Sequence, residues 1–216
     1  MKNMFLKHTL FWPLFRNFVC VIFSCCSMAT HASDYTVVSD SPAMPEFQLL
    51  DHNGQAFNQD SLAKQWTLVL IGFTSCPDVC PYTLGNLAHV IEETSSRVTP
   101  ANIPKVVFLA VGPDRDKNIL EEYVNHYSED FIGVTGEKHN IDKFVQGLDA
   151  FYKFEESVHA HGKKQYDHGV YNVVHSADVR VLDPTGSLVA TLNTPMDAYA
   201  TADILLKLQI EYRKNL

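Results

Sequence analysis

The chain has 216 residues, a length typical of one globular domain rather than two. Hydrophobic residues make up 46% of it and charged residues 19%, which is too apolar for a disordered chain. The formal net charge is −8 and no basic run is present. Because phosphate binding needs a positive surface, nucleic acid is not an expected partner. We expect a folded, acidic domain.

The first 32 residues differ from the rest in charge and composition. They carry three basic side chains and no acidic one, and an apolar stretch at 18–29 is followed by Thr30, His31 and Ala32. This is the pattern of a secretory signal peptide with small residues before its cleavage site. The stretch is shorter than the roughly 20 residues that span a bilayer, but an uncleaved membrane anchor stays an open alternative. We predict a signal peptide over 1–32 and an exported protein, periplasmic or attached to the membrane facing a bacterial periplasm.

Secondary-structure patterns follow in chain order. Residues 33–45 are polar, contain two prolines and are predicted to be a linker. Apolar patterns typical of strands occur at 46–50, 67–73, 105–111, 131–134, 178–182 and 188–192. Helical patterns occur near Ser61 and at 81–95, 117–126, 141–150 and 198–214. A polar loop is expected at 155–171, and Asp183–Gly186 is expected to form the turn of the last two strands.

Alternating strands and helices, followed by a hairpin and a helix, are typical of a thioredoxin-like domain. We expect residues 46–216 to form this α/β fold, with a central mixed sheet flanked by helices. Sites in such sheets gather beyond the carboxyl ends of the strands. The apolar strand at 67–73 leads directly into two cysteines at such a position.

Cys76 and Cys80 are the cysteines that remain once the predicted leader is set aside. In an exported protein they are expected to form a Cys76–Cys80 disulfide. A purely structural staple is disfavoured, because closing so short a loop stabilises a fold little. Amides at the start of the following helix are expected to lower the thiol pKa. The three-residue spacing leaves redox and metal chemistry open, since two sulfurs with a third ligand suit Cu(I), with Zn(II) as an alternative.

The third ligand is sought among the histidines. His175 stands just before the final hairpin, where the thioredoxin topology brings the chain back beside the cysteines. A core or strand-end histidine is the alternative at this position. His159, His161 and His168 fall in the polar loop and are expected to be solvated, although a spaced cluster of this kind can also bind metal. The other histidines outside the leader are expected on the surface or within a helix: His52, His89, His126 and His139.

The segment Phe73–Leu84, FTSCPDVCPYTL, resembles the signature of the Sco (SCO/SenC) family of thioredoxin-like copper-delivery proteins. Further segments resemble the same family: Ala110–Asp116, Thr135-Gly136, Tyr171–Ser176 and Asp183–Gly186. The resemblance implies one copper ion per chain, Cu(I) or Cu(II), held by Cys76, Cys80 and His175. It also implies a function in assembly of the cytochrome c oxidase copper centre, by copper delivery, by reduction of cysteines, or by both. The implied partners are a copper-accepting oxidase subunit and a thiol reductant.

Two positions depart from the family pattern. Gly112 stands where the family usually has an acid before a proline, and Val174 stands where it usually has an acid before the distal histidine. A carboxylate beside a metal-binding imidazole can fix its tautomer, and loss of such groups commonly weakens metal binding about 10–100-fold. Copper affinity, redox potential or partner choice is therefore expected to differ from that of typical members.

The main alternative function is a thiol–disulfide oxidoreductase without metal, in which one cysteine attacks a partner and the other resolves the mixed disulfide. It needs Cys76 and Cys80 but not His175. A peroxidase of the peroxiredoxin type expects a threonine three residues before the reactive cysteine, whereas Thr74 is two before Cys76. A binding module with a permanent disulfide is the non-catalytic alternative. We expect a copper-binding assembly factor rather than a classical enzyme.

Overall fold

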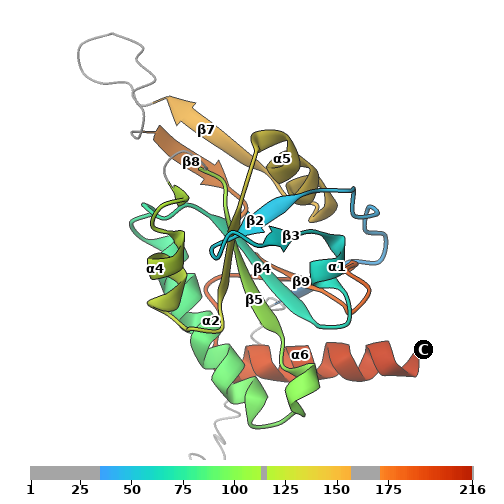
Figure 1. Ribbon diagram of the computed structural model, residues 1–216. Coiled ribbons are helices and arrows are strands. Elements are labelled where there is room, and N and C mark those ends of the chain that lie inside the picture. The colour runs from blue at the N-terminus through green and yellow to red at the C-terminus, as the bar shows by residue number, and fades with distance from the viewer. Residues whose placement is uncertain (1–34, 113–115, 157–170, 216) are drawn as a thin grey trace, which may run out of the picture. The chain divides into compact units, whose positions relative to one another are not determined.

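A large mixed sheet forms the centre of the molecule (Figure 1). The computed structural model describes residues 35–112, 116–156 and 171–215. Within them, eight strands form one sheet in the order β1-β10-β9-β4-β5-β6-β2-β3. These strands are β1 (Tyr35–Val37), β2 (Leu49–Asp51), β3 (Ala56–Phe57), β4 (Thr67–Gly72), β5 (Lys105–Ala110), β6 (Ile132–Thr135), β9 (Val179–Leu182) and β10 (Leu188–Leu192). The helices are α1 (Gln59–Leu62), α2 (Val79–Ser95), η1 (Pro100–Asn102), α4 (Leu120–Asn125), α5 (Lys138–Gly147) and α6 (Ala198–Lys214).

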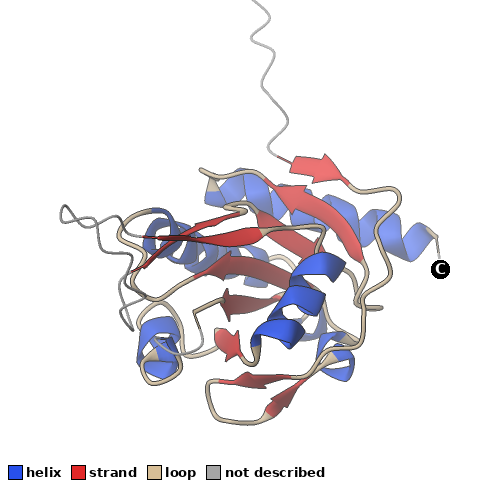
Figure 2. Ribbon diagram, turned by 90° about the horizontal axis from the view of Figure 1, so that it is seen from above, coloured by secondary structure: helices blue, strands red, loops and turns tan. Residues whose placement is uncertain are grey.

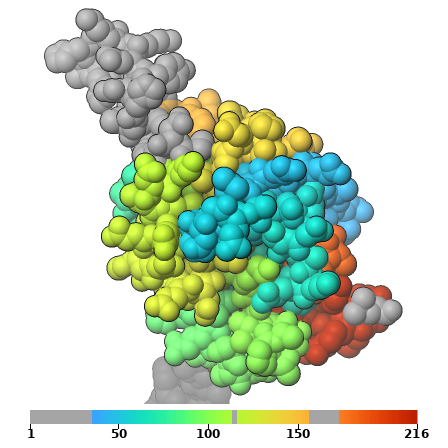
Figure 3. Space-filling model, in the orientation of Figure 1, coloured from blue at the N-terminus to red at the C-terminus, as the bar shows by residue number. Residues whose placement is uncertain are grey.

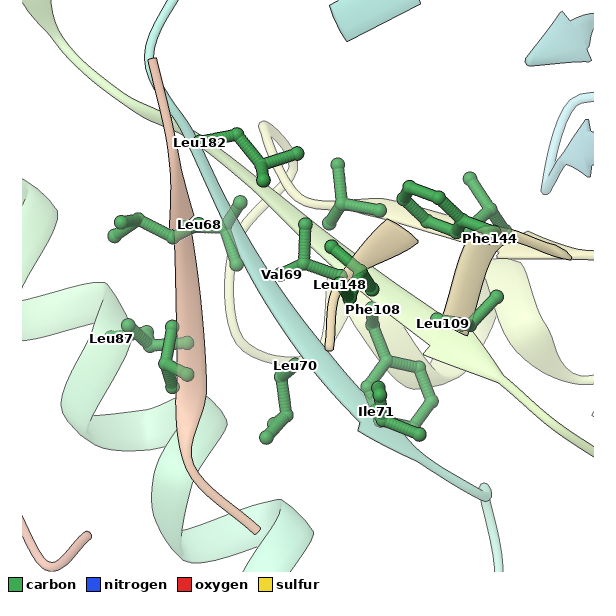
Figure 4. Packing of buried hydrophobic residues seen from close by; sticks show 14 of the residues in the cluster. Leu68, Val69, Leu70, Ile71, Leu87, Phe108, Leu109, Phe144, Leu148 and Leu182 are labelled. Carbon is green, nitrogen blue, oxygen red and sulfur yellow. The ribbon is translucent and has the colours of Figure 1, made fainter. Parts of the chain in front are cut away.

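The apolar strand β4 lies in the middle of this sheet. All of its residues are buried. It pairs in parallel with β5 and antiparallel with β9, so the sheet is mixed as expected. Leu87 of α2 lies on one side of β4, and Phe144 of α5 and Leu148 lie on the other (Figure 4). Helices cover both faces of the sheet (Figure 2), which explains why β4 is continuously apolar.

The predicted linker at 33–45 contains a strand. Residues 35–37 form β1, which pairs antiparallel with β10 at the edge of the sheet. The linker prediction is therefore wrong for these three residues. Two of them are exposed and none is fully buried, so their strand conformation comes from backbone hydrogen bonds to β10 and not from a hydrophobic pattern.

A second, two-stranded sheet was not predicted. β7 (Tyr152–Glu156) pairs antiparallel with β8 (Tyr171–His175), and Tyr152 lies opposite His175. The polar loop expected at 155–171 overlaps both strands at its ends. Residues 157–170, with His159, His161 and His168, lie outside the described residues. The hairpin matters for function because it carries His175.

The bounds of α6 are those predicted, whereas the bounds of α2, α4 and α5 differ from the predicted ones by up to three residues. The most important shift concerns α2, which begins at Val79 instead of Pro81. Proline is compatible with the first turn of a helix, because its missing N–H has no partner within the helix there. The earlier start places Cys80 inside the helix and leaves Cys76 in the preceding loop.

The face of the molecule seen in Figure 3 combines residues from several parts of the chain. Residues of β2, β3 and α1, coloured blue to cyan, lie at its centre, with α4 in yellow-green to one side and α5 in yellow above.

Within residues 35–112, 116–156 and 171–215, no helix has both the length and the apolar character needed to cross a membrane.

Candidate metal centre

The two cysteines follow the carboxyl end of the central strand β4. A tight turn, in which the N–H of Cys76 donates to the carbonyl of Phe73 at 3.1 Å, links this strand end to the first cysteine. Cys80 lies in the first turn of α2, and its N–H donates to Cys76 Sγ at 3.5 Å. Both are free thiols in this structure. Cys76 is 9% exposed and Cys80 is fully buried, so Cys76 is the more exposed of the two residues.

His175 joins this pair from the end of β8. Its Nε2 lies 3.8 Å from Cys80 Sγ, and its ring packs edge-on against Phe73, with ring centroids 6.0 Å apart. One ligand atom from each of Cys76, Cys80 and His175 lies within 4.8 Å of the other two. Residues 95 positions apart are thus brought together, as the thioredoxin topology predicted for His175.

The imidazole of His175 is held by the backbone. Its Nδ1 lies 2.9 Å from the carbonyl oxygen of Ser176. Because a carbonyl only accepts hydrogen bonds, Nδ1 carries the proton and Nε2 keeps its lone pair for a metal. Val174 is 42% exposed, and as the neighbouring residue of a strand it points to the opposite face from His175. In this chain the Ser176 carbonyl therefore orients the imidazole, in place of the acid that the family usually has before the histidine.

The pKa of Cys80 moves in the direction opposite to the one predicted. Burial raises this pKa well above its ordinary value, and the hydrogen bond and charge of Cys76 raise it further. The prediction of a lowered pKa is therefore wrong for Cys80. Loss of hydration outweighs the favourable amides at the helix start, because the charged thiolate is the form that desolvation penalises. Cys80 is a protonated thiol near neutral pH until a metal displaces its proton.

Gly72 makes room for the buried sulfur. A Cβ at this position would lie 2.7 Å from Cys80 Sγ and 2.7 Å from the ring of Phe108. Both distances are shorter than van der Waals contact, so only glycine at the end of β4 lets α2 bring Cys80 this close. The sequence does not single out Gly72, because a glycine inside an apolar strand carries no local sign of what packs against it.

The other described histidines are not part of this cluster. His52 is half-buried, and its Nδ1 accepts a hydrogen bond from the N–H of Gly133 at 3.0 Å. His89 is exposed on α2 beside Glu92, and His126 packs against Tyr127. His139 is exposed on α5. The surface prediction fails only for His52, whose ring nitrogen has a structural use.

Two thiols beyond the end of the central strand β4 and one imidazole from the end of β8 define a site for a soft or borderline metal ion. Known proteins with a metal-binding thioredoxin-like domain are similar to this chain. The family model described as SCO1/SenC matches residues 37–209. The chain belongs to the SCO1/SenC family, as the motif resemblance predicted.

Individual relatives give the same result. The chain is 34% identical over 142 residues to an SCO2-like protein of Rickettsia conorii, a match that covers 65% of this chain and 64% of that protein. The chain thus spans less than two thirds of this relative's length.

Solved structures confirm the thioredoxin-like fold. ScoI of Bradyrhizobium japonicum with copper bound superimposes with a TM-score of 0.64 at 26% identity, covering 77% of this chain and 99% of that one. ScoI of Arabidopsis thaliana with copper bound gives a TM-score of 0.66 at 24% identity, covering 78% and 99% of the two chains. The predicted fold class, a central mixed sheet flanked by helices, is therefore correct.

Proposed function

We propose that this protein binds one copper ion through Cys76 Sγ, Cys80 Sγ and His175 Nε2. The observation that carries the proposal is the convergence of these three atoms within 4.8 Å of one another. Two soft sulfurs and an imidazole suit Cu(I) better than a hard cation, and the Nδ1 hydrogen bond to Ser176 leaves Nε2 available. Membership of the SCO1/SenC family and similarity to ScoI with copper bound support copper over zinc.

We further propose that the copper is cargo for an acceptor protein, namely a cytochrome c oxidase subunit whose copper centre is being assembled. Cys76 is 9% exposed and His175 is half-buried, so these two ligands keep some contact with solvent, whereas Cys80 is fully buried. This placement favours ligand exchange with an incoming thiolate or imidazole. The predicted leader at 1–32 would place the protein outside the cytoplasm, periplasmic or membrane-attached, where a thiol reductant keeps the pair reduced.

His175→Ala tests the three-ligand site. The variant removes a neutral ligand, so we expect Cu(I) affinity to fall about 10–100-fold and the Cu(II) absorption spectrum to change. His126→Ala, which removes an exposed histidine outside the cluster, is the control and should leave both measurements unchanged. Competition titration with a Cu(I) chelator supplies the affinities. Equal affinities and spectra for wild type and His175→Ala would exclude the imidazole as a ligand.

A metal-independent thiol–disulfide oxidoreductase is the second candidate function. The observation in its favour is the pair of free thiols on either side of the start of α2, of which Cys76 is the more exposed. The raised pKa of Cys80 speaks against Cys80 as the attacking nucleophile, because only a thiolate attacks. His175→Ala separates the two functions, since it should leave disulfide exchange with a partner nearly unchanged.

Copper affinity should rise with pH. Because the pKa of Cys80 is raised by burial, this thiol stays protonated in the apoprotein throughout the neutral range, and copper must displace its proton. Displacement of at least one proton makes the apparent Cu(I) affinity increase by about tenfold or more per pH unit. Titrations between pH 6 and pH 8 check the slope, after correction for protonation of the competing chelator. A pH-independent affinity would mean that Cys80 is already a thiolate or does not bind the metal.

A further inference from the structure

A buried carboxylate lies beside the cysteine loop without belonging to the metal cluster. Asp116 follows β5 and is fully buried. Its Oδ1 accepts two hydrogen bonds from Thr74, one from the N–H at 3.1 Å and one from the hydroxyl at 2.6 Å. Its Oδ2 accepts a third from the N–H of Gly112 at 3.1 Å. One side chain therefore binds two segments of the chain that are far apart in sequence.

These two segments are the loops that leave the neighbouring central strands. Thr74 lies two residues after the end of β4 and two before Cys76, and Gly112 lies two residues after the end of β5. The strands themselves continue to pair at this edge, because the N–H of Val111 donates to the carbonyl of Gly72 at 3.0 Å. Asp116 thus extends the link between β4 and β5 past their last paired residues, up to the loop that carries the first cysteine.

We propose that Asp116 is a positioning residue for the metal centre, which acts through Thr74 to hold the Cys76 loop in its metal-binding geometry. The proposal rests on the proposed copper function. Cys76 needs such support, because it lies in a loop before α2, whereas Cys80 is held by the helix and His175 by the hairpin β7–β8. No helix or ladder hydrogen bond holds Thr74, and its N–H and hydroxyl both donate to Asp116.

A carboxylate suits this function better than a neutral group. A buried charge is unfavourable unless it is well hydrogen-bonded, and charge-assisted hydrogen bonds are shorter and stronger than neutral ones. The 2.6 Å distance from the Thr74 hydroxyl to Asp116 is of this short kind. An asparagine amide would present N–H donors to the donors of Gly112 or Thr74, so at least one of the three contacts would be lost.

Thr74→Val and Thr74→Ser form the matched pair of variants that tests the proposal. We call the hydrogen bonds from Thr74 to Asp116 the clamp. Valine has the shape of threonine but lacks the hydroxyl, whereas serine keeps the hydroxyl and lacks only the methyl group. Both leave the Asp116 charge in place, and Asp116→Asn completes the set. The full chain is used, with Cys20, Cys25 and Cys26 replaced by serine in every variant, so that Cys76 and Cys80 are the thiols present.

We expect Thr74→Val and Asp116→Asn to lower Cu(I) affinity about 10–100-fold and to alter the Cu(II)–thiolate absorption, with Thr74→Ser close to wild type. A purely structural function would lower the melting temperature of Thr74→Val but leave affinity and spectrum unchanged at temperatures where the variant is folded, and that result would overturn the proposal. If Asp116→Asn fails to fold, the comparison of Thr74→Val with Thr74→Ser decides the question.

A second measurement separates failure of the clamp from failure of the copper function. Equilibration with reduced and oxidised glutathione reports how readily Cys76 and Cys80 form a disulfide, a reaction in which two protein thiols reduce one glutathione disulfide to two glutathione thiols. We expect Thr74→Val to shift this equilibrium about tenfold toward the dithiol, because the first cysteine is no longer held beside the second. If wild type binds no copper, the proposed copper function is wrong. If the glutathione equilibrium of Thr74→Val equals that of wild type, the proposed function of the clamp is wrong, whether or not copper binds.

Discussion

Oxidation of Cys76 and Cys80 to a disulfide is expected to abolish copper binding, lowering Cu(I) affinity by more than about a thousandfold. A metal needs the free thiolates, and the disulfide removes both anionic ligands and leaves only the imidazole of His175. Binding should return in full when the disulfide is reduced. The structure contains the pair as free thiols, which is the form that the copper function requires.

The measurement is a Cu(I) competition titration of residues 33–216 before oxidation, after oxidation and after reduction. Cys76 and Cys80 are the cysteines of this segment, so any effect of oxidation is assigned to them. Cys80→Ser, which forms no intramolecular disulfide, is the control. It should bind copper weakly under all three conditions. Unchanged Cu(I) affinity of the oxidised wild type would mean that the cysteines are not the ligands.

Gly72→Ala is expected to damage both the core and the metal centre. The added methyl group would lie 2.7 Å from Cys80 Sγ and 2.7 Å from the Phe108 ring, so one or both must move. Overpacking of this kind commonly lowers the free energy of unfolding by about 1–3 kcal/mol. Displacement of Cys80 Sγ should also weaken Cu(I) binding at least about tenfold, because ligand geometry is lost.

Gly85→Ala is the matched control for this substitution. Gly85 lies within α2, and no heavy atom of the surroundings lies within 4 Å of a Cβ at this position. Alanine is the better helix former, so this variant should gain up to about 1 kcal/mol in the free energy of unfolding. Its copper affinity should equal that of wild type. Urea unfolding and Cu(I) titration of both variants check the contrast, and equal behaviour of the two would refute the packing argument at Gly72.

Patterns local to the sequence were enough to predict the main features of the fold. The buried strands β4 and β5 are continuous apolar runs, and the helices α2 and α6 show helical spacing of apolar residues. The strand-to-helix transition at Cys76 and Cys80 placed the candidate site beyond the carboxyl end of a central strand, which is one edge of the sheet. The position of His175 followed from the order of the elements, because a thioredoxin-like topology returns the chain to that edge.

Elements without such a pattern were missed or misplaced. β1 and the hairpin β7–β8 are short or polar and lie at the margins of the fold. They form because their backbones make hydrogen bonds with a neighbouring strand. Their own residues do not predict which strand lies beside them.

The chemistry of the site was decided by contacts between residues distant in sequence. Only the fold reveals that Gly72 must lack a side chain beside Cys80, that burial raises the pKa of Cys80, and that Asp116 reaches Thr74 across 42 positions. The composition and spacing of the sequence by themselves identified the type of fold and the ligand types that converge. Desolvation, steric fit and hydrogen bonding depend on the atoms that lie within a few ångströms of a side chain. The tertiary structure alone determines which atoms these are.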